Sequence, residues 1–594
     1  MKKIINQPES AVLEMCHGIA CANPNLEFVE KYKVLKKRLP DKQKVTLISG
    51  GGCGHEPAHA GFIGKGMLDA AVCGDVFASP SQIQVYKAIQ ETAGEKGTLL
   101  IIKNYSGDMM NFKNAAHLAK EDGLQVDYVK VDDDIAVQDS LYTVGRRGVA
   151  GTVLVHKIAG AAAEAGLSLQ EVKAAAEKAV KNVKSIGFAF SSCTVPAKGT
   201  PTFHLEADQM EYGVGIHGEP GIAREEALSS DELAERMTAA LLQELDLNSA
   251  INIEGNTEIA LLVNGFGGTP LLELYILNHS VMEILTQKGI KVSRIFVGNF
   301  MTSIEMQGAS VSMMKLDAEL KQYLSAPSEA PAFMVTGKER DVAYVPLAKA
   351  ADFGSGADGS PKSELPVVED AFREIYDNQI SLQNMIYIVK QMSDVIISHE
   401  VEFCELDAHA GDGDFGMSVA KGFRRLMAEW PEVMEHTSSI GAFLEECSLI
   451  IMEHCGGASG PIWGSAFRAA GKYAGARQQL SVSEFAQLLQ AAVNGIQSTG
   501  ERSFGRGAVV GDKTLIDALV PCTDAWLAAA DQTDIRTVFE AGAQAAVDGA
   551  KKTEAIVARM GRAGTVGERS IGFPDAGAYA LGVIFTEIYE AMFR

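Results

Sequence analysis

The chain has 594 residues, and its composition and charge exclude several broad classes of protein. Hydrophobic residues make up 47% and charged residues 22%, as in an ordinary soluble globular protein. A formal net charge of −23 argues against a nucleic-acid backbone or an anionic membrane surface as the main partner. With no signal peptide, no membrane-spanning run and nine cysteines that lack C-x-x-C spacing, we expect a cytoplasmic protein with reduced thiols.

The first part of the chain alternates between predicted strands and predicted helices. Apolar runs at 45–48, 99–102 and 126–131 predict buried strands, and helices are predicted at 80–92 and 111–121. Apolar strands that alternate with helices indicate a sheet covered by helices on both faces. Ligands of such sheets favour the loops beyond the carboxyl ends of the strands.

A glycine-rich loop follows the first of these strands. It reads S-G-G-G-C-G-H-E-P-A-H-A-G over residues 49–61, and its glycines allow backbone N–H groups to line a small polar ligand. His55 and His59 match the spacing of a zinc protease, but Pro57 between them is unlike the interior of that enzyme's helix. The loop meets neither the phosphate-loop pattern nor the dinucleotide-binding fingerprint.

Two further polar loops contain candidate functional side chains. Residues 103–108, K-N-Y-S-G-D, place a cation, an amide and a carboxylate at the end of a predicted strand. In the glycine-rich segment 212–221, His217 is poorly suited to an apolar helix face. A solvated loop and a turn histidine with one hydrogen bond are the simpler interpretations. The functional interpretations are a cleft and an imidazole that acts as nucleophile or general base.

A second α/β unit is predicted further along the chain. It comprises a strand at 259–263, a helix at 270–288 and a strand at 291–298. The glycine turn at 264–269 either binds an anion at the start of the helix or permits close packing. We favour packing.

The composition changes after this unit, and the strand signals nearly vanish. Glycine, serine, proline and acidic residues dominate residues 351–366, as in a linker. Beyond them, segments with spaced apolar residues predict about eight helices, including 380–397, 440–454, 465–474, 482–498, 513–530, 535–560 and 576–592. We therefore divide the chain into an α/β lobe at 1–190, a second α/β lobe at 191–350, a linker at 351–367 and an all-helical domain at 368–594.

An acidic turn interrupts the helical domain. Asp407, Asp412 and Asp414 fall within eight residues, and the neighbouring glycines disfavour a continuous helix. A tight turn can aim the three carboxylates at one point, where a hard cation such as Mg²⁺ or Ca²⁺ would relieve their repulsion. An EF-hand is excluded because Phe423 stands where the glutamate of that loop would follow Asp412. The alternative is a solvated acidic turn without a metal.

Several helix junctions of this domain combine glycine with polar residues. They lie at 456–460, 511–517, 561–565 and 575–577. Each alone could be an ordinary helix cap. Together with the acidic turn they predict one rim, where helix starts bind phosphates and Arg562 supplies positive charge.

These residues resemble the ATP-dependent dihydroxyacetone kinases (triokinases), in their single-chain arrangement. The resemblance covers nearly the whole chain, and several separate motifs in the right order are more specific than any one match. The motifs are G-G-G-x-G-H-E-P-A-H-A-G at 50–61, K-N-Y-x-G-D at 103–108, G-I-H-G-E-P-G at 215–221, D-x4-D-G-D-x-G from 407, G-G-x-S-G from 456, G-D-K-T-x-x-D from 511 and G-R-A from 561.

The resemblance implies an α/β substrate-binding portion of two lobes, followed by an all-α nucleotide-binding helical barrel domain. It implies that His217 forms a covalent hemiaminal with the substrate carbonyl, which selects short ketoses and aldoses over glycerol. His55 matches the general base on the terminal hydroxyl, and Asp108 matches the carboxylate that binds this hydroxyl. The substrate loop is completed by Gly52, Cys53, Gly54 and Lys103.

For the helical domain, the resemblance implies that ATP and Mg²⁺ bind together. Asp407, Asp412 and Asp414 match the ligands of the Mg²⁺ that bridges the ATP phosphates. A homodimer is also implied. The residues that match the region around the nucleotide are Asp412, Gly413, Asp414, Phe415, Ala458, Ser459, Lys513, Thr514, Arg562, Asp575, Ala576 and Gly577.

The sequence departs from the family pattern at positions that affect substrate choice. Cys53 stands where serine is common, and Phe415 stands where histidine or cysteine is frequent. We expect a kinase for dihydroxyacetone and glyceraldehyde, with a tetrulose such as erythrulose as the alternative sugar. Competing hypotheses are a phosphotransfer component that keeps a bound nucleotide, a zinc hydrolase, and a lyase that forms a cyclic flavin nucleotide from FAD.

Overall fold

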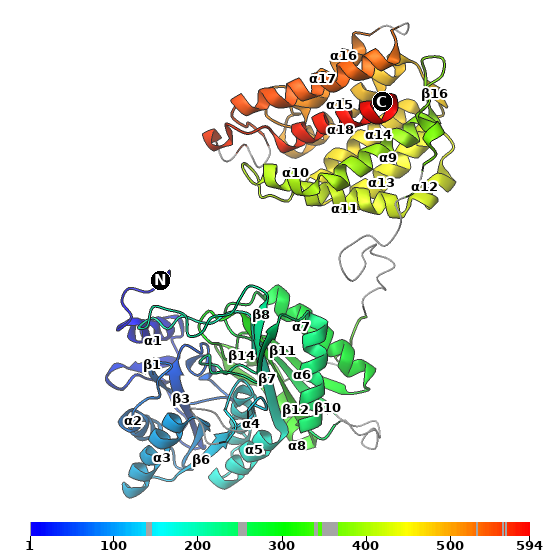
Figure 1. Ribbon diagram of the computed structural model, residues 1–594. Coiled ribbons are helices and arrows are strands. Elements are labelled where there is room, and N and C mark those ends of the chain that lie inside the picture. Colours follow the sequence, from blue (N-terminus) through cyan, green and yellow to red (C-terminus); the bar gives the residue numbers. More distant parts are fainter. Residues whose placement is uncertain are drawn as a thin grey trace. The chain divides into compact units, whose positions relative to one another are not determined.

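The computed structural model describes residues 2–137, 145–247, 258–337, 342–346, 366, 368–529, 533–560, 564 and 567–594. The chain forms two compact units, Met1–Pro346 and Leu347–Arg594 (Figure 1). Apart from residue 366, the predicted linker at 351–367 lies outside the described residues. In the described part of the chain, every helix is too short or too polar to cross a membrane.

The first unit contains two six-stranded sheets. In the first sheet β3 pairs in parallel with β4 and β5, and β5 pairs in parallel with β6, as the alternation of strands and helices predicts. The predicted strands at 45–48, 99–102 and 126–131 are confirmed as β3, β5 and β6. The order is β1 (Leu26–Val29), β2 (Val34–Lys37), β4 (Ala70–Val76), β3 (Thr46–Cys53), β5 (Thr98–Lys103), β6 (Val126–Val131).

The second sheet is mixed, and it begins earlier in the chain than predicted. The predicted lobe boundary at residue 190 is wrong in this respect, because β7 pairs with β12 in the second sheet. The apolar sequence of β7 gives no sign of which sheet it joins. The order is β11 (Lys291–Gly298), β10 (Glu258–Gly265), β12 (Gly308–Leu316), β7 (Val183–Ala189), β8 (Gln209–Tyr212), β9 (Ala223–Glu226).

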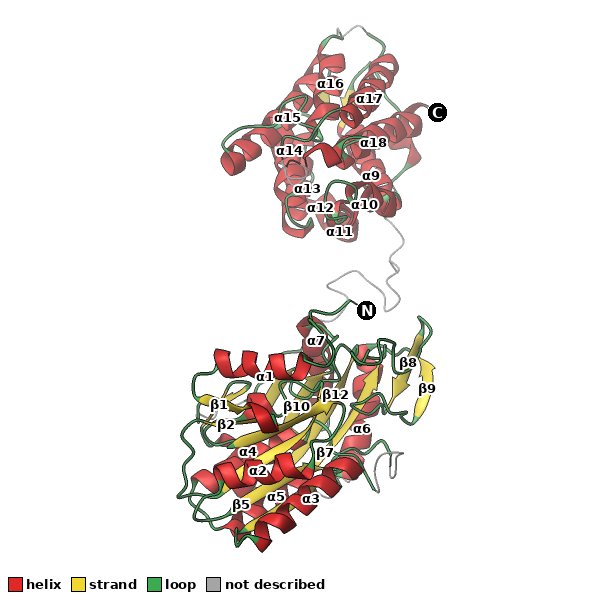
Figure 2. Ribbon diagram, turned by 90° about the vertical axis from the view of Figure 1, so that its left-hand side faces the viewer, coloured by secondary structure: helices red, strands yellow, loops and turns green. Residues whose placement is uncertain are grey.

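Helices and sheets alternate in layers in this unit (Figure 2). The apolar side chains of α2 and α3 pack on one face of the first sheet, and those of α6 and α7 pack on the second sheet. Between the two sheets lies α4, in which every residue from Thr152 to Ala163 is buried. The helices are α1 (Ala11–Ala22), α2 (Gln82–Thr92), α3 (Ser106–Glu121), α4 (Thr152–Glu164), α5 (Leu169–Asn182), α6 (Ser230–Glu244), α7 (Leu271–Gln287) and α8 (Ala318–Ser325).

Local sequence explains where many of the elements begin and turn. Ser81, Ser168 and Ser229 each form a capping box at the start of a helix, and so satisfy N–H groups that the first turn leaves free. In the glycine turn at 264–269, a Cβ on Gly268 would collide with the carbonyl oxygen of Glu305. This close approach supports the packing interpretation of that turn.

The second unit is helical, as predicted. Its described residues form ten α-helices and one two-stranded ribbon, β15 (Ile380–Ser381) with β16 (Gln479–Leu480). The count exceeds the predicted eight because short helices precede the acidic turn and follow α11. They are α9 (Leu382–Ser398), α10 (Glu400–Asp407), α11 (Phe415–Ala428), α12 (Trp430–His436), α13 (Ile440–His454), α14 (Ser459–Ala474), α15 (Val482–Phe504), α16 (Ile516–Leu527), α17 (Ile535–Lys552) and α18 (Ala576–Phe593).

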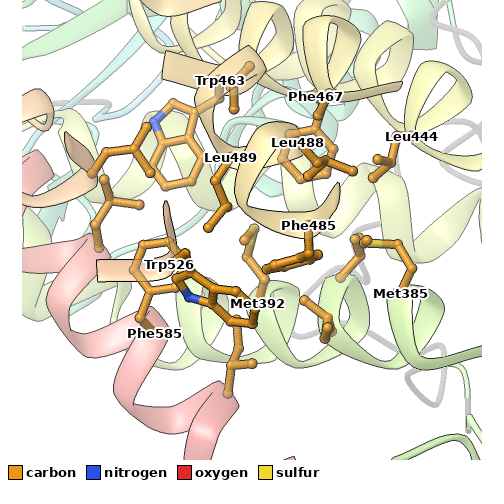
Figure 3. A pocket seen from close by; sticks show the side chains of 18 of the residues that line it. Met385, Met392, Leu444, Trp463, Phe467, Phe485, Leu488, Leu489, Trp526 and Phe585 are labelled. Carbon is orange, nitrogen blue, oxygen red and sulfur yellow. The ribbon is translucent and has the colours of Figure 1, made fainter. Parts of the chain in front are cut away.

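The apolar faces of these helices surround a cavity of about 120 Å³ (Figure 3). Aromatic side chains form much of its wall, with the ring centroid of Phe485 4.6 Å from that of Trp526. Trp526 in turn meets Phe539 edge-on at 4.9 Å. The sulfur-containing side chains of Met385 and Met392 project from α9 into the same region. All of these helices except α10 contribute buried apolar side chains to one shared core.

We predict that Phe485→Ala lowers the free energy of unfolding of the helical unit by about 3–5 kcal/mol, because it enlarges an existing cavity. Tryptophan fluorescence in urea measures this unit alone, since its three tryptophans, Trp430, Trp463 and Trp526, are the only ones in the chain. Val401→Ala, at a side chain that is 69% exposed, is the control and should change little. A loss below about 1 kcal/mol for Phe485→Ala would contradict the prediction.

Candidate active site

The loops beyond the carboxyl ends of β3, β4 and β5 meet at one edge of the first sheet, as expected for parallel strands. The last residues of β3 approach the end of β5 closely, and a glycine stands at this position. Gly51 has a φ of +152°, and a Cβ there would collide with the ammonium of Lys103 at the end of β5. Lys103 is buried and forms an ion pair with Asp108 at 3.2 Å.

A line of hydrogen bonds joins this edge to the second sheet. His55 follows β3, and its Nδ1–H donates to the carbonyl oxygen of Thr302, between β11 and β12, at 2.7 Å. Nε2 of His55 lies 3.1 Å from Nε2 of His217, in the loop between β8 and β9. Nδ1–H of His217 donates to Oε1 of Glu219 at 2.8 Å. Both imidazoles are thus held at Nδ1, with Nε2 facing Nε2.

This arrangement requires a proton between the two Nε2 atoms. If both rings were neutral, two lone pairs would face each other at 3.1 Å, because each Nδ1 already donates its hydrogen. Burial, the neighbouring His217 and the Lys103 ammonium hold the pKa of His55 well below its usual range. Glu219 lies on the other side of His217, with its Oε1 2.8 Å from Nδ1.

Glu219 supplies the negative charge at one end of this series of hydrogen bonds. Its burial alone would raise its pKa, but the charge and hydrogen bond of His217, together with the Arg147 guanidinium, lower it to about 2. Arg147 is fully buried, forms an ion pair with Asp134 at 2.7 Å and donates to the carbonyl oxygen of Gly213 at 2.7 Å. A buried ion pair therefore supports the loop that contains His217.

Aromatic rings fix His217 from the remaining sides. Tyr105 and Phe77 meet its ring edge-on, with centroids at 4.7 and 5.0 Å, and Phe77 also stacks on His55 at 5.1 Å. Phe77 has a φ of +58°, an unusual conformation for a bulky residue that favours a functional explanation. The adjacent cavity measures about 370 Å³ and is lined by Gly52, Phe77, Ser79, Tyr105, Ser106, Gly107, Asp108 and His217.

The structure brings most of the predicted substrate residues together at this cavity. Gly52, Asp108 and His217 line it, whereas His55 and Lys103 lie behind His217 and Asp108 respectively. Cys53 and Gly54 belong to the same loop but are outside the lining. Sequence reasoning missed Phe77, Ser79, Tyr105, Arg147, Glu219 and Thr302, although Tyr105 and Glu219 stand inside motifs that it quoted.

The zinc hypothesis is not supported by the geometry of the two histidines in the glycine loop. Nδ1 of His59 lies 3.0 Å from Nε2 of His156 in α4, whereas the nitrogens of His55 face Thr302 and His217. A zinc protease needs both imidazoles on one ion. Among the described residues, only the acidic turn offers a group of three metal-ligating side chains.

The acidic turn of the helical unit gathers its carboxylates. One oxygen each of Asp407, Asp412 and Asp414 lies within 4.8 Å of the others. The N–H of Gly413, which has a φ of +76°, donates to Asp407 at 2.9 Å and so fixes the turn. Burial, followed by the charges of Asp412 and Asp414, raises the pKa of Asp407. Hard, closely spaced oxygens under mutual repulsion fit Mg²⁺.

A cavity of about 210 Å³ lies beside these carboxylates. It borders the starts of α11, α14, α16 and α18, whose N–H groups favour anions such as phosphate. Asp575 caps α18, and burial raises its pKa to about 7. The predicted nucleotide residues that line the cavity are Asp412, Asp414, Phe415, Ala458, Ser459, Lys513, Thr514, Asp575, Ala576 and Gly577.

Two of the residues predicted to bind the nucleotide are not placed to contact it directly, and a third lies outside the described part of the chain. Gly413 is not in the lining. Lys513 lies along the cavity, but its ammonium donates to backbone carbonyl oxygens, including those of Thr553 and Ser570, so it is not placed as a phosphate ligand. Arg562 falls outside the described residues.

Comparison with known proteins agrees with this two-part arrangement. The family model "Dak1 domain" matches residues 17–332, and "DAK2 domain" matches residues 409–590. Triokinase/FMN cyclase of Rattus norvegicus is 34% identical, over 100% of this chain and 99% of its own. L-erythrulose 1-kinase of Mycolicibacterium smegmatis is 33% identical, over 100% of both chains. The dihydroxyacetone kinase of C. freundii in complex with AMP-PNP and Mg²⁺ is 30% identical, with a TM-score of 0.59 and 99% of both chains covered.

These matches extend over both units and agree with the fold of each. The α/β fold with a following helical domain, expected from the sequence, is confirmed. The chain belongs to the single-chain dihydroxyacetone kinase (triokinase) family and is an ATP-dependent phosphotransferase with an alcohol group as acceptor.

Proposed function

We propose that the protein phosphorylates the terminal hydroxyl of dihydroxyacetone, and of glyceraldehyde, after His217 has captured the carbonyl carbon. The observation that carries this proposal is the hydrogen-bond line from Thr302 through His55 and His217 to Glu219, which presents Nε2 of His217 at a small polar cavity. A tetrulose remains the second candidate, because one full-length relative is named L-erythrulose 1-kinase. The homodimer and the cytoplasmic location stay predictions.

Capture requires an unprotonated Nε2 on His217, and His55 is placed to accept the proton from that atom. The proton between the rings passes to Nε2 of His55 as Nε2 of His217 attacks the carbonyl carbon. The carbon–oxygen double bond opens, and the oxygen takes the same proton back from His55. The product is a hemiaminal whose alkylated imidazole keeps Nδ1–H and the positive charge beside the Glu219 carboxylate, and the reaction consumes and releases no proton. Glycerol lacks a carbonyl and cannot follow this route.

Asp108 is the side chain best placed to hold the hydroxyl that receives the phosphoryl group. It lines the cavity, and Lys103 and Ser79 fix its two oxygens. An ionised carboxylate accepts a hydrogen bond from the hydroxyl and orients its oxygen for attack. The expected role of His55 as the base on this hydroxyl requires the substrate to lie within reach of Nε2, which now faces His217.

In the helical unit, Asp407, Asp412 and Asp414 would hold the Mg²⁺ of Mg·ATP. The ion would neutralise charge on the phosphates, as required in phosphoryl transfer. The starts of α11, α14, α16 and α18 provide N–H groups for the phosphate oxygens. Positioning and charge neutralisation account for most of catalysis in this reaction class, so the carboxylates need no acid–base role.

We predict that His217→Ala abolishes covalent capture and lowers kcat by about 10²–10⁴-fold, because the nucleophile is gone. The wild type should convert the carbonyl signal of [2-¹³C]dihydroxyacetone into a tetrahedral one and consume ATP with dihydroxyacetone but not with glycerol. His204→Ala, at an exposed histidine beside Glu206, is the matched control. Undiminished turnover by His217→Ala would remove the covalent step, and a higher kcat/KM for erythrulose would favour the tetrulose.

Glu219→Gln should destabilise the protein in a pH-dependent manner. The pKa of Glu219 is about 2 in the folded protein and near its ordinary value when unfolded, so its charge contributes about 3 kcal/mol above pH 4.5. That contribution disappears as the pH falls from about 4.5 towards 2. Calorimetry should show a lower melting temperature for the variant at pH 7 and a shrinking difference below pH 4.5. The exposed Glu206→Gln is the control, and a difference independent of pH would argue against this charge.

Asp412→Asn should raise the KM for Mg·ATP by about tenfold or more, because a metal ligand loses its charge. Dihydroxyacetone capture, followed by the ¹³C signal, should be unchanged. Asp524→Asn, at an exposed aspartate in α16 away from the cavity, controls for the substitution itself. Equal damage to ATP use and to ketose capture would indicate misfolding rather than a lost metal ligand.

A further inference from the structure

The ammonium of Lys513 lies in a cage of four backbone carbonyl oxygens. Its Nζ is 2.7 Å from the oxygen of Thr553, 3.3 Å from that of Ile556, 2.6 Å from that of Ser570 and 2.8 Å from that of Phe573. The residue is 2% exposed, and in the described part of the chain no carboxylate forms an ion pair with it. Burial lowers the pKa of Lys513. The charges of Asp575, Glu554 and Asp517 oppose this shift, and the four carbonyl oxygens accept the hydrogens of the ammonium.

The four cage residues lie outside the lining of the nucleotide cavity, but they are linked to segments that border it. Thr553 lies at the end of α17, and its Oγ1 accepts the N–H of Asp575, which caps α18, at 2.8 Å. Ser570 ends a 3₁₀ turn (Gly567–Ser570). The ring of Phe573 stacks on His409 of the acidic turn, with centroids 3.7 Å apart and planes at 6°. The ammonium therefore contacts both the segment before α18 and a residue that touches the metal turn.

The backbone at Lys513 is strained to achieve this arrangement. Its φ of +63° lies in the left-handed region, which non-glycine residues rarely adopt. Lys513 and Thr514 line the cavity, while the ammonium of Lys513 stays within the cage. Strain of this kind persists only where surrounding contacts impose it, so the cage contacts are strong enough to hold the residue there.

We propose that Lys513 is a positioning residue that acts as a built-in monovalent cation, whose ammonium holds the segments at 553–556 and 570–577 in the shape that Mg·ATP requires. This inference rests on the proposed nucleotide site. Backbone carbonyls bind K⁺ by replacing its hydration shell, and NH₄⁺ has the same charge and nearly the same size. Removal of the side chain should therefore leave a site that takes up K⁺ or NH₄⁺ from solution.

Lys513→Ala of the full-length chain tests this proposal, assayed with LiCl, KCl or NH₄Cl at equal ionic strength and constant Mg²⁺. In LiCl the KM for ATP should rise by about tenfold to a hundredfold, while the KM for dihydroxyacetone stays unchanged. KCl and NH₄Cl should restore most of the loss. The wild type and Lys472→Met, at an exposed lysine of α14, should be indifferent to the salt.

A second variant and a second measurement separate cation binding from general stability. Lys513→Met fills the space with an apolar side chain that excludes a cation, so it should lose ATP affinity without rescue by any salt. Unfolding followed by tryptophan fluorescence, which reports the helical unit alone, should show that KCl raises the melting temperature of Lys513→Ala but not of the wild type.

Several results would overturn the proposal. They are an unchanged KM for ATP in Lys513→Ala, a loss that is equal in all three salts, and a variant that stays unfolded in KCl and NH₄Cl. Failure of the proposed function is distinguishable, because it would appear as a wild type that binds no Mg·ATP in any salt. Selective rescue of both ATP affinity and melting temperature by K⁺ and NH₄⁺ is the expected result.

Discussion

The proposed substrate chemistry depends on two imidazoles that face each other inside a layered α/β unit. His55 is held from the second sheet by the carbonyl of Thr302, and His217 is held by Glu219 within its own loop. Because both Nδ1 atoms are committed, the 3.1 Å gap between the Nε2 atoms holds one proton. The stacking of the two sheets is thus what brings the proposed nucleophile, His217, next to the proposed base, His55.

The two units provide opposite environments, and each suits its half of the reaction. Capture of a carbonyl ends with a proton on the former carbonyl oxygen, and burial beside His217 and Lys103 lowers the pKa of His55, so that this ring gives up a proton readily. Phosphoryl transfer needs exposed carboxylates and helix starts that neutralise and orient a highly charged group. Asp412 is exposed and Asp407 half-buried, as a site that admits hydrated Mg²⁺ requires. One protein environment could hardly satisfy both demands, so their division between two units is physically reasonable.

The sequence predicted the types of secondary structure and the positions of the polar turns better than it predicted the tertiary contacts between elements. Glycines around His217 and Asp412 indicated turns, and in the structure each of these two residues lies in a turn that lines a cavity. Arg147 could not be found this way, because its contacts with Asp134 and Gly213 exist only after the sheets pack. The same holds for β7, which joins the second sheet through tertiary pairing that its apolar pattern does not specify.

Lys513 lines the predicted nucleotide cavity, but its ammonium contacts backbone carbonyl oxygens and is not placed as a phosphate ligand. A lysine beside a predicted phosphate site is ordinarily interpreted as a phosphate ligand, yet helix starts and Mg²⁺ ligands already surround this cavity. Thr553 and Ile556 follow the end of α17, and an ammonium from a neighbouring loop donates to both of their carbonyl oxygens. A lysine committed to four carbonyls adds rigidity where a mobile one would add only charge. Its contribution to nucleotide binding is therefore geometric, through the segment that Asp575 anchors to α18.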